Sequence, residues 1–147
     1  MSIITTSLHQ ILSSTVDFYY IYKSFHWNIT GQNFYQFHTL FDSHASKIYE
    51  SQDLISERIR QLDVKVASNL VDFTKDSVMT HNKPEPDDNF QSILAYLLDQ
   101  HNLIIALLES TIDTTSENKD FATADMLTKF LQDQQQMAWF IKSSIIK

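Results

Sequence analysis

Residues 33–62, NFYQFHTLFDSHASKIYESQDLISERIRQL, contain no glycine or proline and carry apolar residues at helical spacing, so they predict one long helix. Two pairs of metal-ligand residues lie within this stretch, His38 with Asp42 and Asp53 with Glu57. The pairs are placed symmetrically about the midpoint between residues 47 and 48. At about 100° per residue, all four side chains fall within an arc of about 100° on one helix face.

One copy of this helix cannot bring the four residues to a single metal ion. His38 and Asp53 are roughly 22 Å apart along the axis at 1.5 Å per residue. If a second copy lies antiparallel against the first, His38 and Asp42 of one chain meet the second pair of the other chain. The pattern therefore predicts a two-fold dimer with two identical metal sites across its interface. His26, near the end of the preceding segment, is the fifth candidate ligand.

The spacing alone leaves a second interpretation open. The carboxylates of the second pair could belong to a surface charge pattern with Arg58 and Arg60, while the first pair forms a local hydrogen bond. The usual intrachain di-iron site is excluded, because it requires two Glu-x-x-His motifs and no glutamate here has a histidine three residues later. Without cysteine, any metal site must use imidazole and carboxylate ligands, which suit Fe(II), Mn(II) or Zn(II).

Length and composition favour one all-α domain over residues 1–147. The 147 residues include one glycine and two prolines, too few for the frequent turns of a β fold. The net charge of −7 argues against nucleic-acid binding. No apolar run approaches the roughly 20 residues of a membrane span, and the first basic residue is Lys23, which argues against a signal peptide. We therefore expect a cytoplasmic protein.

Apolar spacing predicts four long amphipathic helices, over residues 3–28, 33–62, 90–114 and 120–144. Gly31 supplies the turn between the first two helices, and Asp120 is a good N-cap for the last. Four long helices with one long connection between the second and third are typical of the ferritin-like four-helix bundle.

The long connection, residues 63–89, is predicted to hold a short extra helix. This helix spans residues 70–78, with Ser68 or Asn69 as its N-cap. The connection closes with the run Pro84-Glu-Pro-Asp-Asp88, which cannot continue a helix.

Three motifs, in order and with matching gaps, resemble the Dps-type miniferritins (DNA-binding proteins from starved cells). They are HWNITGQNF at residues 26–34, FHTLFD at 37–42 and DLISERIRQL at 53–62. The run DFATADML at 120–127 and the pair Trp139-Phe140 resemble the family's last helix. The family implies a four-helix bundle with a short helix in the crossover, assembled from two-fold dimers into a hollow homo-dodecamer.

The resemblance implies an iron-storage and detoxification protein. Such a ferroxidase oxidises Fe(II), preferably with hydrogen peroxide rather than O₂, stores the ferric mineral inside the shell and so protects the cell from oxidative stress. The family's iron ligands correspond to His26, His38 and Asp42 of one subunit and to Asp53 and Glu57 of its partner. The two partner carboxylates are expected to anchor the iron that binds first, together with the histidines. Asp42 would help to hold a second iron or a water.

Further residues have two interpretations each. Trp27, beside His26, is either an electron donor near the site or a packing residue. The family's iron-entry pores would place Asp120 and Asp125 at the pore, although Asp120 is equally explained as a helix cap. Lys129 stands where the family often has another acid, which would weaken the attraction of the pore for cations. We interpret His101, among leucines and isoleucines, as a hydrogen-bonded core histidine.

Two other functions remain open from the sequence. Many family members bind DNA through a lysine-rich N-terminal tail, but the first 22 residues here contain no lysine or arginine, so direct DNA binding is not expected. A helical shell that acts mainly as a surface-recognition or antigenic protein, with a vestigial metal site, is one alternative. An ordinary dimeric bundle that binds Zn(II) without forming a shell is the other.

Overall fold

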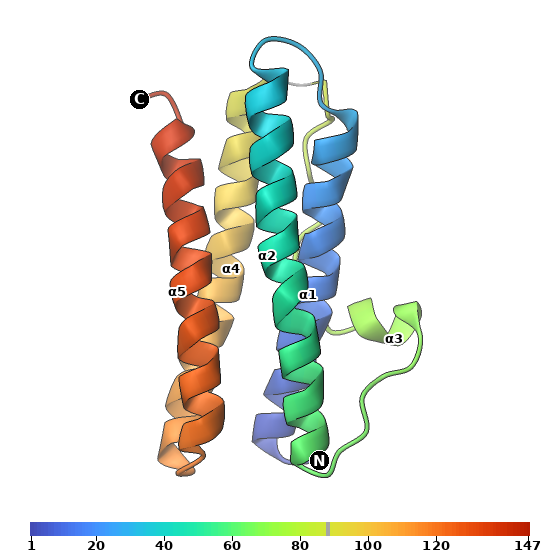
Figure 1. Cartoon of the computed structure of the whole chain (residues 1–147), viewed down its shortest axis with the longest axis vertical. Helices are drawn as coiled ribbons and strands as arrows, with labels where there is room; N and C mark the ends of the chain where they lie inside the picture. The colour runs from blue at the N-terminus through green and yellow to red at the C-terminus, as the bar shows by residue number, and fades with distance from the viewer. Residues whose placement is uncertain (88) are drawn as a thin grey trace.

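The computed structural model describes residues 1–87 and 89–147, which form five helices and, within those ranges, no strand (Figure 1). The helices are α1 (Ile3–Asn28), α2 (Phe34–Gln61), α3 (Leu70–Thr74), α4 (Phe90–Glu117) and α5 (Phe121–Ser144). The four long helices form the predicted bundle, and α3 is the short helix of the crossover. The predicted ferritin-like fold class is therefore confirmed.

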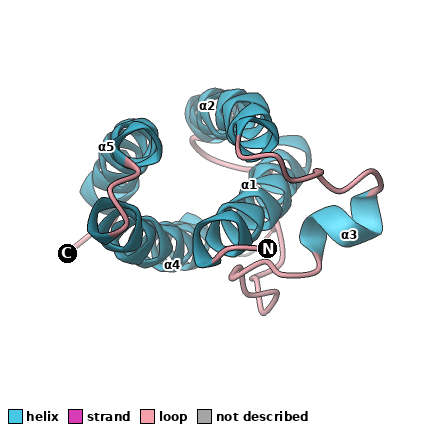
Figure 2. Ribbon diagram, turned by 90° about the horizontal axis from the view of Figure 1, so that it is seen from below, coloured by secondary structure: helices cyan, strands magenta, loops and turns pink. Residues whose placement is uncertain are grey.

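Two helical hairpins make up the bundle. Viewed end-on, the four long helices form a ring, and α3 lies outside it beside α1 (Figure 2). α1 packs mainly against α2 and α4 mainly against α5, while contact between α1 and α4 joins the hairpins. The crossover therefore runs along the outside of the bundle from the end of α2 to the start of α4.

Short polar side chains fix the starts of four helices. The caps are Ser2 for α1, Asn69 for α3, Asn89 for α4 and Asp120 for α5, and each accepts a hydrogen bond from a backbone N–H three residues later. This bond satisfies one of the amides that a helix leaves unpaired at its start. α2 begins differently, after Gly31 with a φ of 101° and Asn33 with a φ of 68°. The predicted caps Asn69 and Asp120 and the Gly31 turn are thus confirmed.

The core is a continuous apolar column along the bundle axis. The largest fully buried side chains are Tyr22, Phe18, Phe25, Phe41, Leu8, Ile11, Ile29, Ile48, Ile55, Ile59, Ile93 and Leu94. On α2 the buried positions recur every three or four residues, which is the period of a helix with one apolar face. The opposite face of α2 is left to carry the predicted ligands.

Polar side chains of α1 and α4 anchor the crossover segment after α3. The Ser77 hydroxyl donates to Asp17 Oδ2 at 2.7 Å, and the Val78 amide donates to the Ser14 hydroxyl at 3.1 Å. Farther along, the Thr80 amide donates to Gln100 Oε1 at 2.9 Å. The segment is therefore tied first to α1 and then to α4.

Two predicted helix ends differ from the structure. α3 stops at Thr74 rather than at residue 78, because Ser77 and Val78 bond to α1 instead of continuing the helix. α4 continues three residues beyond the predicted end at residue 114. Its polar Thr115 is fully buried and donates its hydroxyl proton to the Ile112 carbonyl at 2.9 Å, which satisfies the side chain inside the helix. Of the predicted closing run, Asp88 lies outside the described residues.

Among the described residues, every helix is too short or too polar to cross a membrane.

Replacing Leu97 by alanine should destabilise the bundle more than the same change at Leu103 on the same helix. Leu97 is 0% exposed and Leu103 is 37% exposed. We expect Leu97→Ala to lower the free energy of unfolding by about 2–5 kcal/mol, through lost burial and a residual cavity. Leu103→Ala should lower it by about 1 kcal/mol or less. Urea denaturation followed by circular dichroism measures both, and equal losses would contradict the assigned core.

Candidate metal centre

The turn between α1 and α2 brings two predicted ligands together. His26 lies in the last turn of α1 and His38 near the start of α2. Each ring bonds to the backbone of the other residue: His26 Nδ1 donates to the His38 carbonyl at 2.7 Å, and His38 Nδ1 donates to the His26 carbonyl at 2.7 Å. The rings stack with centroids 3.9 Å apart and an interplanar angle of 15°.

These two hydrogen bonds determine the tautomer of both rings. A carbonyl oxygen can only accept, so each Nδ1 must carry the proton. In the neutral ring Nε2 then holds a lone pair, which is the atom that coordinates a metal. A backbone carbonyl behind the ring is also the usual support for a histidine that binds a metal. Both histidines are therefore oriented as ligands before any ion arrives.

Asp42 completes a half-site with the histidines, and Lys23 neutralises it. Asp42 Oδ1 lies 3.9 Å from His26 Nε2 and 2.8 Å from Lys23 Nζ. The hydrogen bond from Lys23 lowers the pKa of Asp42, with a further contribution from the positive charge. An ammonium group thus stands beside the carboxylate that was predicted to hold a second iron or a water.

Lys23 was not predicted as a site residue, although its position in the sequence suggests a role there. It is the only lysine or arginine among the first 46 residues, and it lies three residues before His26 on one helix. That spacing puts the two side chains on the same face of α1. The partner of Lys23 could not be predicted, because it depends on how α1 and α2 are aligned.

The other two predicted ligands lie far from this half-site in the same chain. Asp53 and Glu57 are exposed in the C-terminal half of α2. Within residues 1–87 and 89–147, no group of three or more histidine, aspartate or glutamate side chains is placed to hold a metal ion. One chain therefore pairs His26 with His38 and places Asp42 beside His26, and it leaves Asp53 and Glu57 apart from them.

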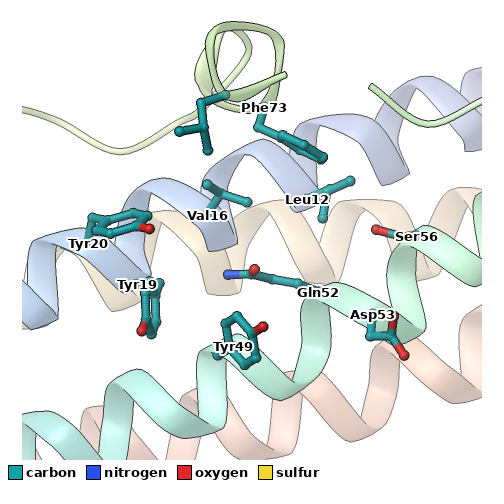
Figure 3. Close-up of a pocket in the computed structure, with 10 residues that line it drawn as sticks. Leu12, Val16, Tyr19, Tyr20, Tyr49, Gln52, Asp53, Ser56 and Phe73 are labelled. Carbon is teal, nitrogen blue, oxygen red and sulfur yellow. The ribbon is translucent and has the colours of Figure 1, made fainter. Parts of the chain in front are cut away.

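A cavity of about 540 Å³ between α1, α2 and α3 lies beside Asp53 (Figure 3). Tyr19, Tyr20 and Tyr49 line it together with aliphatic side chains, and Asp53 is the only carboxylate among its lining residues. Tyr20 and Tyr49 are exposed. A largely apolar, open hollow beside a candidate metal ligand is a feature that the sequence analysis did not identify.

Trp27 projects outward at the end of α1. Its side chain is 59% exposed, and Lys23 Nζ lies 5.6 Å from the centroid of its ring. The indole therefore contributes little to the core of a single chain. A positive charge over the ring also opposes removal of an electron from it, so this contact disfavours the predicted donor role of Trp27.

The two predicted pore residues have different surroundings. Asp120 accepts bonds from the Thr123 amide at 3.1 Å and from Arg58 at 2.9 Å. Burial acts to raise the pKa of Asp120, but the bonds from Thr123 and Arg58 outweigh it and lower the pKa. The carboxylate is thus used as a helix cap and as an ion-pair partner. Asp125 is exposed, and Lys129 forms an ion pair with Asp133 at 2.6 Å.

The centre of the bundle holds hydrogen-bonded neutral side chains where a di-iron protein would place carboxylates. His101 is fully buried, as predicted, and bonds to Tyr22 and Gln134. His44 is also buried, and its Nδ1 lies 2.9 Å from the Tyr22 hydroxyl oxygen. The hydrogen-bond partners of His101 could not be predicted from the pattern of one helix, because each partner lies on a different helix.

A family model described as the ferritin-like domain matches residues 5–147 of this chain. The DNA protection during starvation protein of Agrobacterium fabrum is 27% identical over 140 residues, which cover 94% of this chain and 85% of that protein. Dps from Thermosynechococcus elongatus superposes with a TM-score of 0.92 at 26% identity, covering 98% of this chain and 90% of that one. DpsC from Streptomyces coelicolor gives a TM-score of 0.91 at 27% identity, with coverages of 98% and 84%.

Asp120→Ala should destabilise the protein near neutral pH by about 0.5–2 kcal/mol, because α5 loses its N-cap. The pKa of Asp120 is lower in the folded protein than its ordinary value of 3.8. Its stabilising effect is therefore complete above the unfolded pKa and is lost as the pH falls through the folded pKa. Denaturation of both proteins from pH 7 to pH 2 should show the difference shrinking at the acidic end. Asp125→Ala is the matched control, and an equal loss there would contradict the cap.

Proposed function

Because this chain belongs to the ferritin-like family and is a Dps-type protein, we propose that it oxidises Fe(II) with hydrogen peroxide and stores the ferric product inside a hollow dodecamer. Membership of this family supports iron storage and protection as the general role. The observation that carries the proposal is the half-site, in which His26 and His38 each hold a lone pair on Nε2 and His26 Nε2 lies 3.9 Å from Asp42. Iron is the substrate and cargo of this activity.

The donor atoms of the site suit Fe(II). Imidazole nitrogen and carboxylate oxygen are good ligands for this ion, and the chain contains no cysteine that would favour softer metals. The hydrogen bonds to the backbone hold both imidazoles in place, so little rearrangement is needed on binding. Few protein ligands leave room for an oxidant to reach the metal.

We propose that a second copy of the chain completes the site with Asp53 and Glu57. Both carboxylates are exposed on the same face of α2 as His38 and Asp42. The apolar cavity next to Asp53 and the exposed side chains of Tyr20 and Tyr49 form a surface that a second copy would cover. An antiparallel α2 of the partner satisfies the symmetry of both ligand pairs, so an isolated monomer is expected to be inactive.

Peroxide consumption and iron storage would protect the cell without contact with DNA. The oxidation removes both reactants that generate hydroxyl radical. The net charge of −7 for each chain opposes direct binding to phosphate, so we propose that protection is chemical.

Replacing both Asp53 and Glu57 by alanine should abolish the oxidation of Fe(II) by peroxide. The two side chains are exposed in the single chain, so their loss should leave its fold intact. Ferric absorbance after addition of Fe(II) and peroxide measures the activity, and light scattering checks the particle. Glu50→Ala, which removes an exposed carboxylate from the same helix, should retain the wild-type rate. Wild-type activity in the double variant would refute the ligand assignment.

Mixing two inactive variants tests whether subunits share the site. One variant carries His26→Ala and His38→Ala, and the other carries Asp53→Ala and Glu57→Ala. After joint refolding, half of the dimers are mixed and each contains one intact site of two, so roughly a quarter of the wild-type activity should return. If the mixture stays inactive although mass spectrometry detects mixed dimers, the proposal that two subunits share one metal site is wrong.

Light scattering coupled to size-exclusion chromatography tests the shell directly. The proposal expects a particle with twelve times the mass of the chain. A particle with twice the mass of the chain would contradict storage inside a shell and would leave only a dimeric metal-binding bundle.

A further inference from the structure

One side chain from each long helix contributes to a buried hydrogen-bonded chain at the centre of the bundle. Tyr22 comes from α1, His44 from α2, His101 from α4 and Gln134 from α5, and all four are buried. The Tyr22 oxygen lies 2.6 Å from His101 Nε2 and 2.9 Å from His44 Nδ1. His101 Nδ1 lies 2.7 Å from Gln134 Oε1.

The direction of each hydrogen bond follows from Gln134. Its amide oxygen can only accept, so His101 Nδ1 carries a proton and His101 Nε2 holds a lone pair. The Tyr22 hydroxyl must therefore donate to His101 Nε2. The same hydroxyl oxygen then accepts from His44 Nδ1, which leaves His44 Nε2 without a hydrogen-bond partner among the described residues. Tyr22 is thus a phenol whose proton already points at a neutral imidazole.

Such a phenol can lose an electron without forming a buried charge at its oxygen. Burial raises the pKa of Tyr22 and lowers the pKa of His101 to about 3, so both groups are neutral near pH 7. Ionising the phenol here is unfavourable. If the hydroxyl proton moves to His101 as the electron leaves, the product at Tyr22 is a neutral phenoxyl radical.

Tyr22 is close to the half-site. It precedes His26 by one helical turn on α1, about 6 Å along the axis. Its ring also packs on Phe41, at 5.7 Å between centroids, and Phe41 is the neighbour of Asp42. Two short routes therefore link the Tyr22 phenol to the half-site, one along α1 to His26 and one through Phe41 of α2 to Asp42.

Reduction of peroxide at the half-site requires a second electron donor. Reduction of peroxide to water takes two electrons, and one Fe(II) supplies only one. Lys23 Nζ is 2.8 Å from Asp42 and so stands where a second cation would approach this carboxylate. With a single iron per site, the remaining one-electron step would release hydroxyl radical.

We propose that Tyr22 is an electron relay that supplies the second electron for peroxide reduction, with His101 as its proton acceptor. This inference rests on the proposed ferroxidase function. Hydrogen peroxide takes one electron from Fe(II), one from Tyr22 and two protons from solvent, its O–O bond breaks, and two waters form. The Tyr22 proton moves to His101 Nε2, leaving Fe(III), a phenoxyl radical and an imidazolium. A second Fe(II) then reduces the radical, and the proton returns to Tyr22.

Among the aromatic side chains near the half-site, the structure favours Tyr22 over Trp27 for this role. Trp27 is largely exposed and has the Lys23 ammonium over its ring, which opposes oxidation. Tyr22 is shielded from solvent and has a hydrogen-bonded base. A radical held there would also be kept away from other molecules.

Freeze-quench electron paramagnetic resonance on the assembled protein tests the relay. One Fe(II) per chain is loaded and hydrogen peroxide is added. We expect a phenoxyl signal that narrows with ring-deuterated tyrosine, is lost in Tyr22→Phe and persists in Tyr35→Phe, whose exposed tyrosine lies on α2. Tyr22→Phe should also release more hydroxyl radical to a spin trap. A signal that survives Tyr22→Phe, or one that is lost only in Trp27→Phe, would overturn the assignment.

A measurement on the wild-type protein covers the case in which Tyr22→Phe does not fold. With ¹⁵N-labelled histidine, pulsed resonance should detect coupling between the radical and imidazole nitrogen, and absence of that coupling rejects Tyr22. Ferric absorbance is followed in the same samples. Iron oxidation without a tyrosyl radical rejects the relay alone, whereas no oxidation by peroxide rejects the proposed function and the relay with it.

Discussion

The paired hydrogen bonds between His26 and His38 are the interaction on which the metal centre depends. Each ring donates to the backbone of the other helix, so the bonds join the end of α1 to the start of α2 and fix the tautomers of both imidazoles. The turn at Gly31 makes this pairing possible, because its backbone adopts a positive φ that other residues disfavour. Lys23 reaches Asp42 only in the same alignment of the two helices. A shift of one helix along the other would remove the half-site and its neutralising cation together.

The helices and their caps could be predicted because their determinants are local. Apolar spacing, Asn69, Asp120 and Gly31 each act within a few residues of chain, and the structure agrees with them. The predicted ends of α3 and α4 were wrong for two different reasons. Ser77 bonds to α1, which is a tertiary contact, whereas Thr115 satisfies its hydroxyl within α4 and so does not end that helix. Spacing could likewise put Asp42 one turn after His38. It could not give the alignment of α1 with α2, and the role of Lys23 follows from that alignment.

The contacts at the centre of the bundle could likewise be predicted only in part from the sequence. The leucines and isoleucines around His101 correctly indicated a buried, hydrogen-bonded histidine. Its partners Tyr22, His44 and Gln134 lie on three other helices, and they meet only because each helix has one particular rotation about its axis. Helical periodicity predicts which face of each helix is buried. It does not predict which residues of the four helices lie at the same level of the bundle and contact one another. Polar contacts between helices are therefore found from the structure.

The anchored crossover has a consequence for how chains exchange parts. In a protein made of two helical hairpins, a free connection would let the α4–α5 hairpin of one chain pair with the α1–α2 hairpin of another. Here Ser77 and Val78 are bonded to α1, and Thr80 is bonded to α4. Opening the connection would break these bonds and expose the buried groups that make them. The crossover thus opposes domain swapping and keeps the two hairpins of one chain paired with each other.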